Sequence, residues 1–244
     1  MIALFTDFGV TGPYVGQVKA VLARYSPDSV VIDLMHDAPV HNPRASSYLL
    51  SAFSASLPDG AVVLAVVDPG VGSSQRDAVV VKACNKYFVG PGNGLFGVLT
   101  QLDQKAKAYK IDTSTTHASA TFHGRDIFAP VAAKLASGFE LAGELTSVEP
   151  SQMPILGPID LTEILYIDHF GNAMTGLRGS SLSKRDKLSL NARLLSYANT
   201  FAEAEAGEPF WYVNSSGLVE IAVNCGRAVD YFNLRIGHTL DIVK

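Results

Sequence analysis

The chain has 244 residues, 48% of them hydrophobic, and is therefore long enough to bury a substantial core. Its formal net charge is −4 and its lysines and arginines are dispersed, so it lacks the basic surface that binds nucleic acid or an anionic membrane. Cys84 and Cys225 lie far apart without metal-ligand spacing, and no apolar run approaches the roughly 20 residues that span a bilayer. We expect a cytoplasmic protein with a small-molecule ligand and no nucleic-acid or membrane partner.

Short apolar segments alternate with helical patterns as far as about residue 140, which is typical of βαβ units. The pattern predicts strands at 2–6, 30–34 and 61–67, a strand pair at 78–83 and 87–89, helices at 13–24 and 45–53, and another helix after Asn93-Gly94. Asp126 is expected to cap a helix that runs to about Leu135 and ends at Gly138. Residues 1–150 are thus predicted to form an α/β domain with a largely parallel sheet flanked by helices.

The segment 61–67 is the most informative of these strands. Its seven apolar residues follow one another without polar alternation, which is typical of a strand covered on both faces. Asp68 comes directly after it, on a bend rich in proline and glycine. Ligands of open α/β sheets bind at the carboxyl ends of the strands, so Asp68 is placed where a ligand is expected.

The composition changes at residues 151–158, which contain two prolines and a glycine without any apolar period and are predicted to be a linker. Beyond it, short strands are expected at 164–167, 173–177, 188–190, 209–213 and 218–223, separated by glycine, asparagine and serine. Residues 159–244 are therefore predicted to form a smaller β-barrel domain, with a sandwich as the alternative.

A carboxylate also ends the first strand, in Thr6-Asp7-Phe8-Gly9. The Asp7 side chain at this place can accept hydrogen bonds from both hydroxyls of a ribose, as acidic residues do in nucleotide-binding α/β folds. The alternative is that Asp7 only caps the turn. The nearby glycines lack the spacing of a phosphate-binding loop.

Asp68, Arg76 and His123 are predicted to lie on loops above one sheet. Together they can position a water molecule, with Asp68 or His123 taking its proton and Arg76 stabilising hydroxide. The alternative is that His123 is a structural residue, as a single histidine often is. A zinc site made of His36, His41 and His123 has no recognisable spacing, and no metal is predicted.

The second domain carries one further cluster, at residues 166–172. Asn172 offers a donor and an acceptor in a fork that can bind the edge of an adenine, and Phe170 can supply a flat apolar wall. Asp168, Gly171 and Asn172 are also ordinary turn residues, so a plain turn between two strands is the alternative.

Taken together, these segments resemble the S-adenosylmethionine (SAM) hydroxide adenosyltransferases, which form adenosine and are related to fluorinases and chlorinases. The resemblance covers nearly the whole chain and is carried by six ordered motifs, Thr6-Asp7-Phe8-Gly9, Val67-Asp68-Pro69-Gly70-Val71-Gly72, Arg76, Pro91-Gly92-Asn93-Gly94-Leu95, Thr121-Phe122-His123-Gly124-Arg125-Asp126 and Asp168-His169-Phe170-Gly171-Asn172. It implies an α/β domain, a β-barrel domain and a homotrimer whose sites lie between neighbouring subunits.

The resemblance also implies roles for individual residues. Asp7 would hold the ribose diol, while Asp68, Arg76 and His123 would activate water for attack on the 5′ carbon of SAM. The remaining substrate contacts would come from Asn172 and Phe201 at the adenine, Asp168 and Ser215 at the methionine end, and Phe8, Asn93 and Phe170 nearby. SAM is then the substrate and no cofactor is expected.

The resemblance leaves two alternatives to hydrolysis: a SAM-dependent halide adenosyltransferase, and a sensor that binds SAM or adenosine without turnover. Halogenating relatives carry tyrosines at the positions of Asp68 and His123, and a carboxylate repels a halide, which favours hydrolysis. Family members usually have an acidic residue at Gly12 and an aromatic one at His41, and halogenases an arginine at Ser216. These differences concern binding of the substrate.

Overall fold

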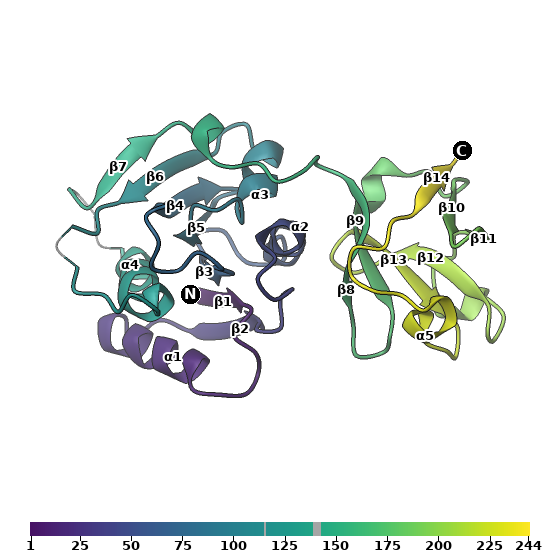
Figure 1. Ribbon diagram of the computed structural model, residues 1–244, viewed down its shortest axis with the longest axis horizontal. Coiled ribbons are helices and arrows are strands. Elements are labelled where there is room, and N and C mark those ends of the chain that lie inside the picture. The colour runs from purple at the N-terminus through teal and green to yellow at the C-terminus, as the bar shows by residue number, and fades with distance from the viewer. Residues whose placement is uncertain (115, 139–142) are drawn as a thin grey trace. The chain divides into compact units, whose positions relative to one another are not determined.

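The structure is a computed structural model that describes residues 1–114, 116–138 and 143–244 (Figure 1). The chain divides into two compact units, Met1–Gly157 and Pro158–Lys244. Among the described residues, no helix has the length and apolar character needed to cross a membrane.

The N-terminal unit is built on a seven-stranded sheet in the order β2-β1-β3-β5-β4-β6-β7. The strands are β1 (Ile2–Thr6), β2 (Val31–Met35), β3 (Val62–Val66), β4 (Ala78–Ala83), β5 (Lys86–Pro91), β6 (Lys107–Ile111) and β7 (Leu145–Val148). Strands β2, β1, β3 and β5 pair in parallel, whereas β4, β6 and β7 join by antiparallel pairing. β6 therefore runs in the direction of the four parallel strands, and β4 and β7 run against it.

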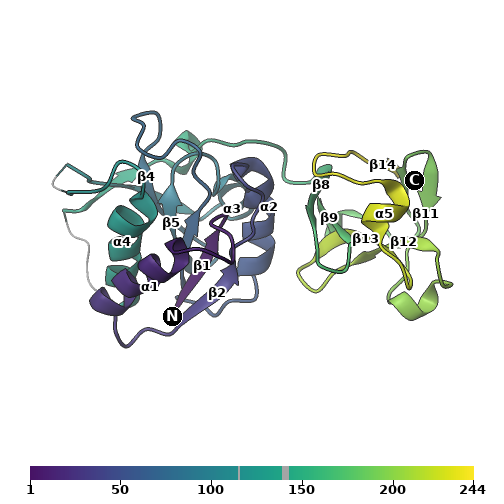
Figure 2. The ribbon, with the colours of Figure 1, turned by 60° about the horizontal axis from the view of Figure 1, so that its bottom comes forward.

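Helices cover both faces of this sheet. They are α1 (Tyr14–Tyr25), α2 (Pro43–Ser54), α3 (Gly97–Leu102) and α4 (Ala129–Ala136), the last preceded by a π-helical turn, η1 (Gly124–Phe128). Figure 2 shows α1 and α4 on one face and α2 and α3 on the other. No residue from Ala61 to Val67 is more than 4% exposed, because β3 is covered on both sides. The predicted α/β architecture, a largely parallel sheet flanked by helices, is confirmed.

One expectation about local structure in this unit is wrong, and two strands were missed. Asp126 does not cap a helix but lies inside η1, where its carboxylate accepts a hydrogen bond from the Ser119 amide at 2.9 Å and pairs with Arg125. The strands β6 and β7 were not predicted, because their exposed polar residues interrupt the apolar pattern.

The C-terminal unit contains two antiparallel sheets. One has four strands in the order β12-β13-β9-β8 and the other three in the order β11-β10-β14. Their bounds are β8 (Leu161–Ile167), β9 (Ala173–Arg178), β10 (Lys187–Leu190), β11 (Arg193–Leu195), β12 (Pro209–Val213), β13 (Leu218–Val223) and β14 (Asp241–Val243). The unit also has a short helix, α5 (Ala228–Phe232), and 3₁₀ turns at η3 (Gly179–Ser181) and η4 (Phe201–Glu203), while η2 (Pro150–Gln152) lies in the N-terminal unit.

The predicted β-barrel corresponds to two antiparallel sheets, and no closed barrel of continuous ladders forms in residues 158–244, all of which the structure describes. Single bridges instead link the edge strands of the two sheets. Glu163–Thr239 links β8 to the segment before β14, and Tyr197–Trp211 links the segment after β11 to β12. The core is packed around Trp211, which is 1% exposed.

Candidate active site

Asp68 and Arg76 form a buried ion pair at the carboxyl end of β3. Arg76 donates from Nε to Asp68 Oδ1 at 3.1 Å and from Nη2 to Oδ2. The Arg76 side chain is 6% exposed and the Asp68 side chain 4%. Removing such charges from water is costly, and two parallel hydrogen bonds are the geometry that best offsets the cost. The guanidinium also lies over the ring of Phe128, 5.4 Å from its centroid.

His123 contacts the same guanidinium. Its Nδ1 lies 2.9 Å from Arg76 Nη2, and because an arginine can only donate, Nδ1 accepts and the neutral imidazole carries its proton on Nε2. Burial and then the positive charge of Arg76 lower the pKa of His123 below its usual value, against weaker opposing effects of Asp68 and Asp126. The histidine is therefore a neutral N–H donor at pH 7.

Gly72 allows the loop that carries Asp68 to approach the segment before His123. Its φ is +78°, and a Cβ atom at this position would lie 2.2 Å from the backbone oxygen of Ala120. Both the positive φ and the clash with the Ala120 oxygen therefore exclude any residue larger than glycine here. This close approach helps to bring Asp68 and His123, which come from different loops, to one wall.

Asp68 and His123 line a cavity of about 290 Å³ in the N-terminal unit. Its other lining residues are Asp7, Phe8, Tyr14, His41, Val66, Val71, Thr121, Phe122 and Gly124. The Asp7 carboxylate accepts a hydrogen bond from the His41 amide at 3.0 Å. This bond holds the carboxylate in place and leaves it with further lone pairs for a ligand.

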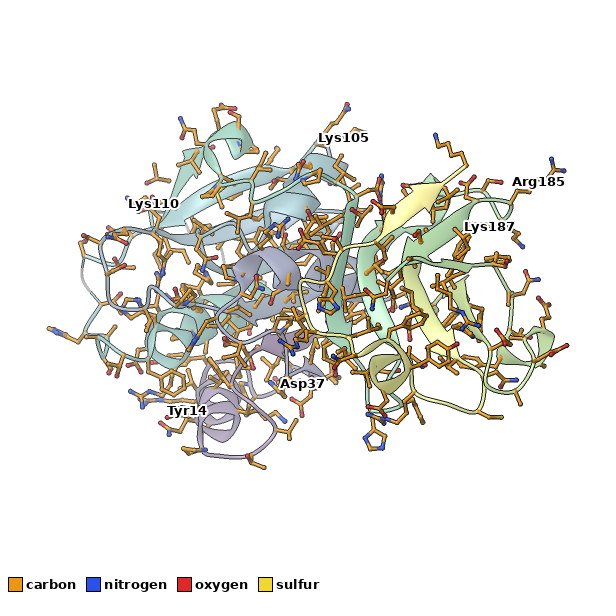
Figure 3. The ribbon with its side chains drawn as sticks, turned by 45° about the vertical axis from the view of Figure 1, so that its right-hand side comes forward. Tyr14, Asp37, Lys105, Lys110, Arg185 and Lys187 are labelled. Carbon is orange, nitrogen blue, oxygen red and sulfur yellow. The ribbon has the colours of Figure 1, made fainter. Side chains whose placement is uncertain are left out.

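Aromatic side chains form another part of this wall. The rings of Phe8, Tyr14 and Phe122 contact one another in tilted or edge-to-face geometry, with centroids 5.5 to 6.0 Å apart. Figure 3 labels Tyr14, the first residue of α1. A Cβ atom at Gly124 would lie 3.1 Å from Phe8 Cζ, so this glycine lets the ring pack closely.

Asn93 and His36 support this region from outside the cavity wall. The Asn93 side chain donates to the backbone oxygen of Val67 at 2.9 Å and thereby holds the end of β3 just before Asp68. His36 lies between Thr6 Oγ1 at 2.8 Å and Asp33 Oδ1 at 2.9 Å. Among the described residues, no group of three or more His, Cys, Asp or Glu side chains is arranged to hold a metal.

The C-terminal unit has a separate pocket of about 780 Å³. All five site residues that the sequence predicts in this unit line it, namely Asp168, Phe170, Asn172, Phe201 and Ser215. The other lining residues are Met174, Tyr212, Asn214, Ser216, Glu220, Val223, Cys225, Gly226 and Arg227. The pocket lies on the face of the four-stranded sheet that carries Met174, Tyr212 and Glu220.

Asp168 and Asn172 form one hydrogen-bonded turn in this pocket. Asp168 Oδ1 accepts from the Asn172 backbone amide at 2.8 Å and its Oδ2 accepts from Asn172 Nδ2 at 3.2 Å. The two aromatic residues on the rim differ in exposure, because Phe170 is 72% exposed whereas Phe201 is 39% exposed and packs edge-on against Phe210 and Tyr212. Phe201 is thus the better supported ring for stacking.

Sequence reasoning did not single out Tyr212, Asn214 or Glu220 as pocket residues. Glu220 could have been noticed, because it is the only charged residue in the apolar stretch 218–223. Its side chain is almost fully buried. Tyr212 and Asn214 carry no comparable signal, since their place in the pocket depends on how β12 pairs with β13.

Both units match the domains of one protein family. Residues 2–143 match the SAM hydroxide adenosyltransferase N-terminal domain and residues 162–241 match the C-terminal domain. The chain belongs to the SAM hydroxide adenosyltransferase family. This confirms the resemblance identified from the six motifs.

Named relatives and a solved structure align with nearly the whole chain. A protein of Thermus thermophilus named (R)-S-adenosyl-L-methionine hydrolase is 38% identical over 97% of this chain and 96% of its own. A crystal structure of a conserved protein from Thermotoga maritima is 32% identical, with a TM-score of 0.90 over all of both chains. A fluorinase of Actinopolyspora mzabensis is 25% identical over 100% of this chain and 97% of its own. The chain is thus more similar to this hydrolase than to this fluorinase.

Proposed function

We propose that the protein hydrolyses SAM to adenosine and L-methionine, by in-line attack of water or hydroxide on the 5′ carbon. The observation that carries the proposal is the hydrogen-bonded group Asp68–Arg76–His123 at the wall of a cavity that also contains Asp7. The hydrolase from Thermus thermophilus, at 38% identity, supports the same reaction. Its name specifies the (R) form of SAM, and we propose that form as the substrate here.

The reaction suits these groups because the leaving group is a neutral thioether, which needs no general acid. The protein has only to align a nucleophile and stabilise its negative charge. Arg76 supplies a buried positive charge, and the Nε2–H of His123 can donate to the nucleophile. Because Nδ1 of His123 is already bound to Arg76, we assign the water's proton to Asp68 or to solvent, with Arg76 and His123 holding the hydroxide.

The substrate contacts follow from the two pockets. In the N-terminal cavity Asp7 would accept from the ribose hydroxyls, with Phe8 beside it, while Asn93 would support the loop of Asp68. In the C-terminal pocket, Asn172 and Phe201 would bind the adenine with Phe170 as an apolar wall nearby, and Asp168 and Ser215 would lie near the methionine end. Because each pocket holds only some of these groups, we also propose the homotrimer, with N- and C-terminal pockets from neighbouring subunits completing each site.

The alternative reaction is transfer of the adenosyl group to a halide, which the fluorinase relative represents. The Asp68 carboxylate argues against it, since a negative charge at the nucleophile's position opposes halide binding.

We also propose that the protein works in a reducing compartment such as the cytoplasm. The free thiols of Cys84 and Cys225 support this location.

The decisive experiment is incubation of the purified protein with SAM in buffers with and without chloride or fluoride, followed by chromatography and mass spectrometry. Adenosine and methionine in every buffer are expected. A halide-dependent 5′-halo-5′-deoxyadenosine would replace the proposal by the halide transferase. Tight binding of intact SAM without any product would identify a sensor.

A further inference from the structure

The buried side chain of His36 lies behind the turn that carries Asp7. His36 directly follows β2, which pairs with β1, and it is 8% exposed. Its ring lies between Thr6 Oγ1, which is 2.8 Å from Nδ1, and Asp33 Oδ1, which is 2.9 Å from Nε2. Thr6 is 2% exposed and directly precedes Asp7. Burial of such polar groups costs desolvation energy, and the proposed reaction gives them no role.

The hydrogen bonds of this buried chain have a defined direction. Against burial, which raises the pKa of Asp33, hydrogen bonds from Lys19 and His36 lower it below its ordinary value. Asp33 is therefore a carboxylate, which can only accept, and Nε2 of His36 carries a proton. In the neutral imidazole Nδ1 is then an acceptor, so the Thr6 hydroxyl donates to it. The lone pairs of Thr6 Oγ1 are left for the Phe8 amide, which donates at 3.3 Å.

His36 thus holds the residues on either side of Asp7. Through the Thr6 hydroxyl its ring fixes the Phe8 amide. Its own backbone oxygen accepts from the Gly9 amide at 2.7 Å. Asp7 lies between these anchors, so the direction of its side chain depends on them.

The loop that begins at His36 makes two further bonds to the same turn. The Ala38 amide donates to the Thr6 backbone oxygen at 3.2 Å, and the His41 amide donates to the Asp7 carboxylate at 3.0 Å. A change at the His36 ring would therefore act on the turn and on this loop together. The position of the Asp7 carboxylate is coupled to both.

The order of carboxylate, imidazole and hydroxyl in Asp33, His36 and Thr6 is also that of a nucleophilic triad. Thr6 cannot act as a nucleophile, because its hydroxyl is buried and its lone pairs face a backbone amide. It does not line the N-terminal cavity either. The arrangement suits a positioning role instead.

We propose that His36 is a positioning residue for Asp7, which acts through the Thr6 hydroxyl to align the Asp7 carboxylate with both hydroxyls of a ribose. The inference rests on the proposed function, in which Asp7 binds the ribose. Two hydroxyls can donate to one carboxylate only in a narrow geometry, because hydrogen bonds weaken steeply as their angle departs from the optimum. A turn that can rotate keeps one of these bonds and loses the other. The preference for ribose over deoxyribose therefore reports on the alignment.

The test is calorimetric titration of the full-length protein with adenosine and with 2′-deoxyadenosine at about pH 8, well above the ordinary pKa of a histidine. The wild type is expected to bind adenosine at least about tenfold more tightly, because 2′-deoxyadenosine lacks one hydrogen bond to a charged group. Thr6→Val keeps the shape of the side chain but removes the hydroxyl, so the preference should fall to about threefold or less. Thr6→Ser retains a hydroxyl and should keep the full preference.

Thr175→Val is the matched control, because it removes a buried threonine hydroxyl in the C-terminal unit, one that donates to the Val219 backbone oxygen at 2.8 Å. It should keep the full preference. If Thr6→Val does not fold, His36→Gln and His36→Asn form a second pair. The glutamine amide can replace Nε2 but leaves Thr6 without its acceptor, whereas the asparagine oxygen can replace Nδ1. The preference should fall in His36→Gln and persist in His36→Asn.

The ratio of the two affinities distinguishes positioning from a structural role, since general loosening of the fold weakens both nucleosides alike. An unchanged preference in Thr6→Val overturns the inference, as do an equal fall in Thr6→Ser and a wild type that does not prefer adenosine. In the second pair, equal ratios in His36→Gln and His36→Asn overturn it. Product analysis with SAM is separate: the expected ratios without cleavage of SAM remove only the proposed reaction, and cleavage with an unchanged ratio removes only this inference.

Discussion

The two pockets are built from different kinds of side chain. The N-terminal cavity, of about 290 Å³, contains Asp7 and Asp68, with Arg76 bound behind its wall. The C-terminal pocket, of about 780 Å³, is larger, and it combines amides and rings such as Asn172 and Phe201 with the carboxyl groups of Asp168 and Glu220. One region is thus organised around a buried ion pair, and the other around hydrogen-bonding and stacking groups.

This difference separates chemistry from recognition. A buried ion pair keeps a positive charge fixed and poorly hydrated, which favours a hydroxide but contributes little to the choice of a base. Amides and aromatic rings bind a purine without activating water. Changes in the N-terminal cavity should therefore act mainly on turnover, apart from the ribose contact, and changes in the C-terminal pocket mainly on affinity.

The largest effect is expected from Asp68→Asn. Loss of the carboxylate removes the partner of Arg76 and should lower kcat by about a thousandfold, while adenosine binding changes by less than about threefold. Steady-state kinetics and calorimetry measure the two quantities. Asp77→Asn is the matched control, because the Asp77 ion pair with Lys110, which Figure 3 labels, lies on the surface. An equal loss of binding and turnover in Asp68→Asn would contradict the separation of roles.

Asp7→Ala should have the next largest effect, and it acts on binding. Removal of charge-assisted hydrogen bonds to the ribose is expected to weaken adenosine binding by about 10- to 100-fold. The wild type should also bind adenosine more tightly than 2′-deoxyadenosine, and the variant should lose this preference. If the variant still discriminates between the two nucleosides, Asp7 only supports the turn through the His41 amide.

Phe201→Ala should weaken adenosine binding by about tenfold with little change in kcat, because one stacking interaction is worth about 1–3 kcal/mol. Calorimetry measures the loss. Leu194→Ala offers a comparison, since Leu194 is also an exposed apolar residue of the C-terminal unit but lies on β11. A fall in kcat without a change in affinity would remove Phe201 from the adenine pocket.

The smallest effect concerns pH. Burial and Arg76 lower the pKa of His123, so the folded protein binds fewer protons than the unfolded chain between that pKa and the ordinary value of 6.5. Stability from this group is therefore present above pH 6.5 and is lost as the pH falls through this window. NMR titration of the His123 ring, assigned by comparison with His123→Gln, should give a midpoint below 6.5. A midpoint at or above 6.5 would show that Arg76 does not act on it as described.

Local sequence patterns predicted much of the fold and the places of the main charged groups. The uninterrupted apolar run 61–67 predicts a buried strand, and the position of Asp68 after it predicts a carboxylate at the ligand-binding edge. Such patterns work because burial and side-chain periodicity are properties of neighbouring residues. They also singled out the cluster at 166–172, whereas Phe201 and Ser215, which line the same C-terminal pocket, came only from the resemblance to the family.

Only the tertiary structure decided which groups meet. The hydrogen bonds of Arg76 to both Asp68 and His123 depend on the course of two loops, and the contacts of Glu220 depend on the pairing of β13 with its neighbours. The way in which single bridges link the two sheets of residues 158–244 depends likewise on pairing between strands distant in sequence. No local pattern records such pairings, because their energies come from contacts that exist only once the chain has folded.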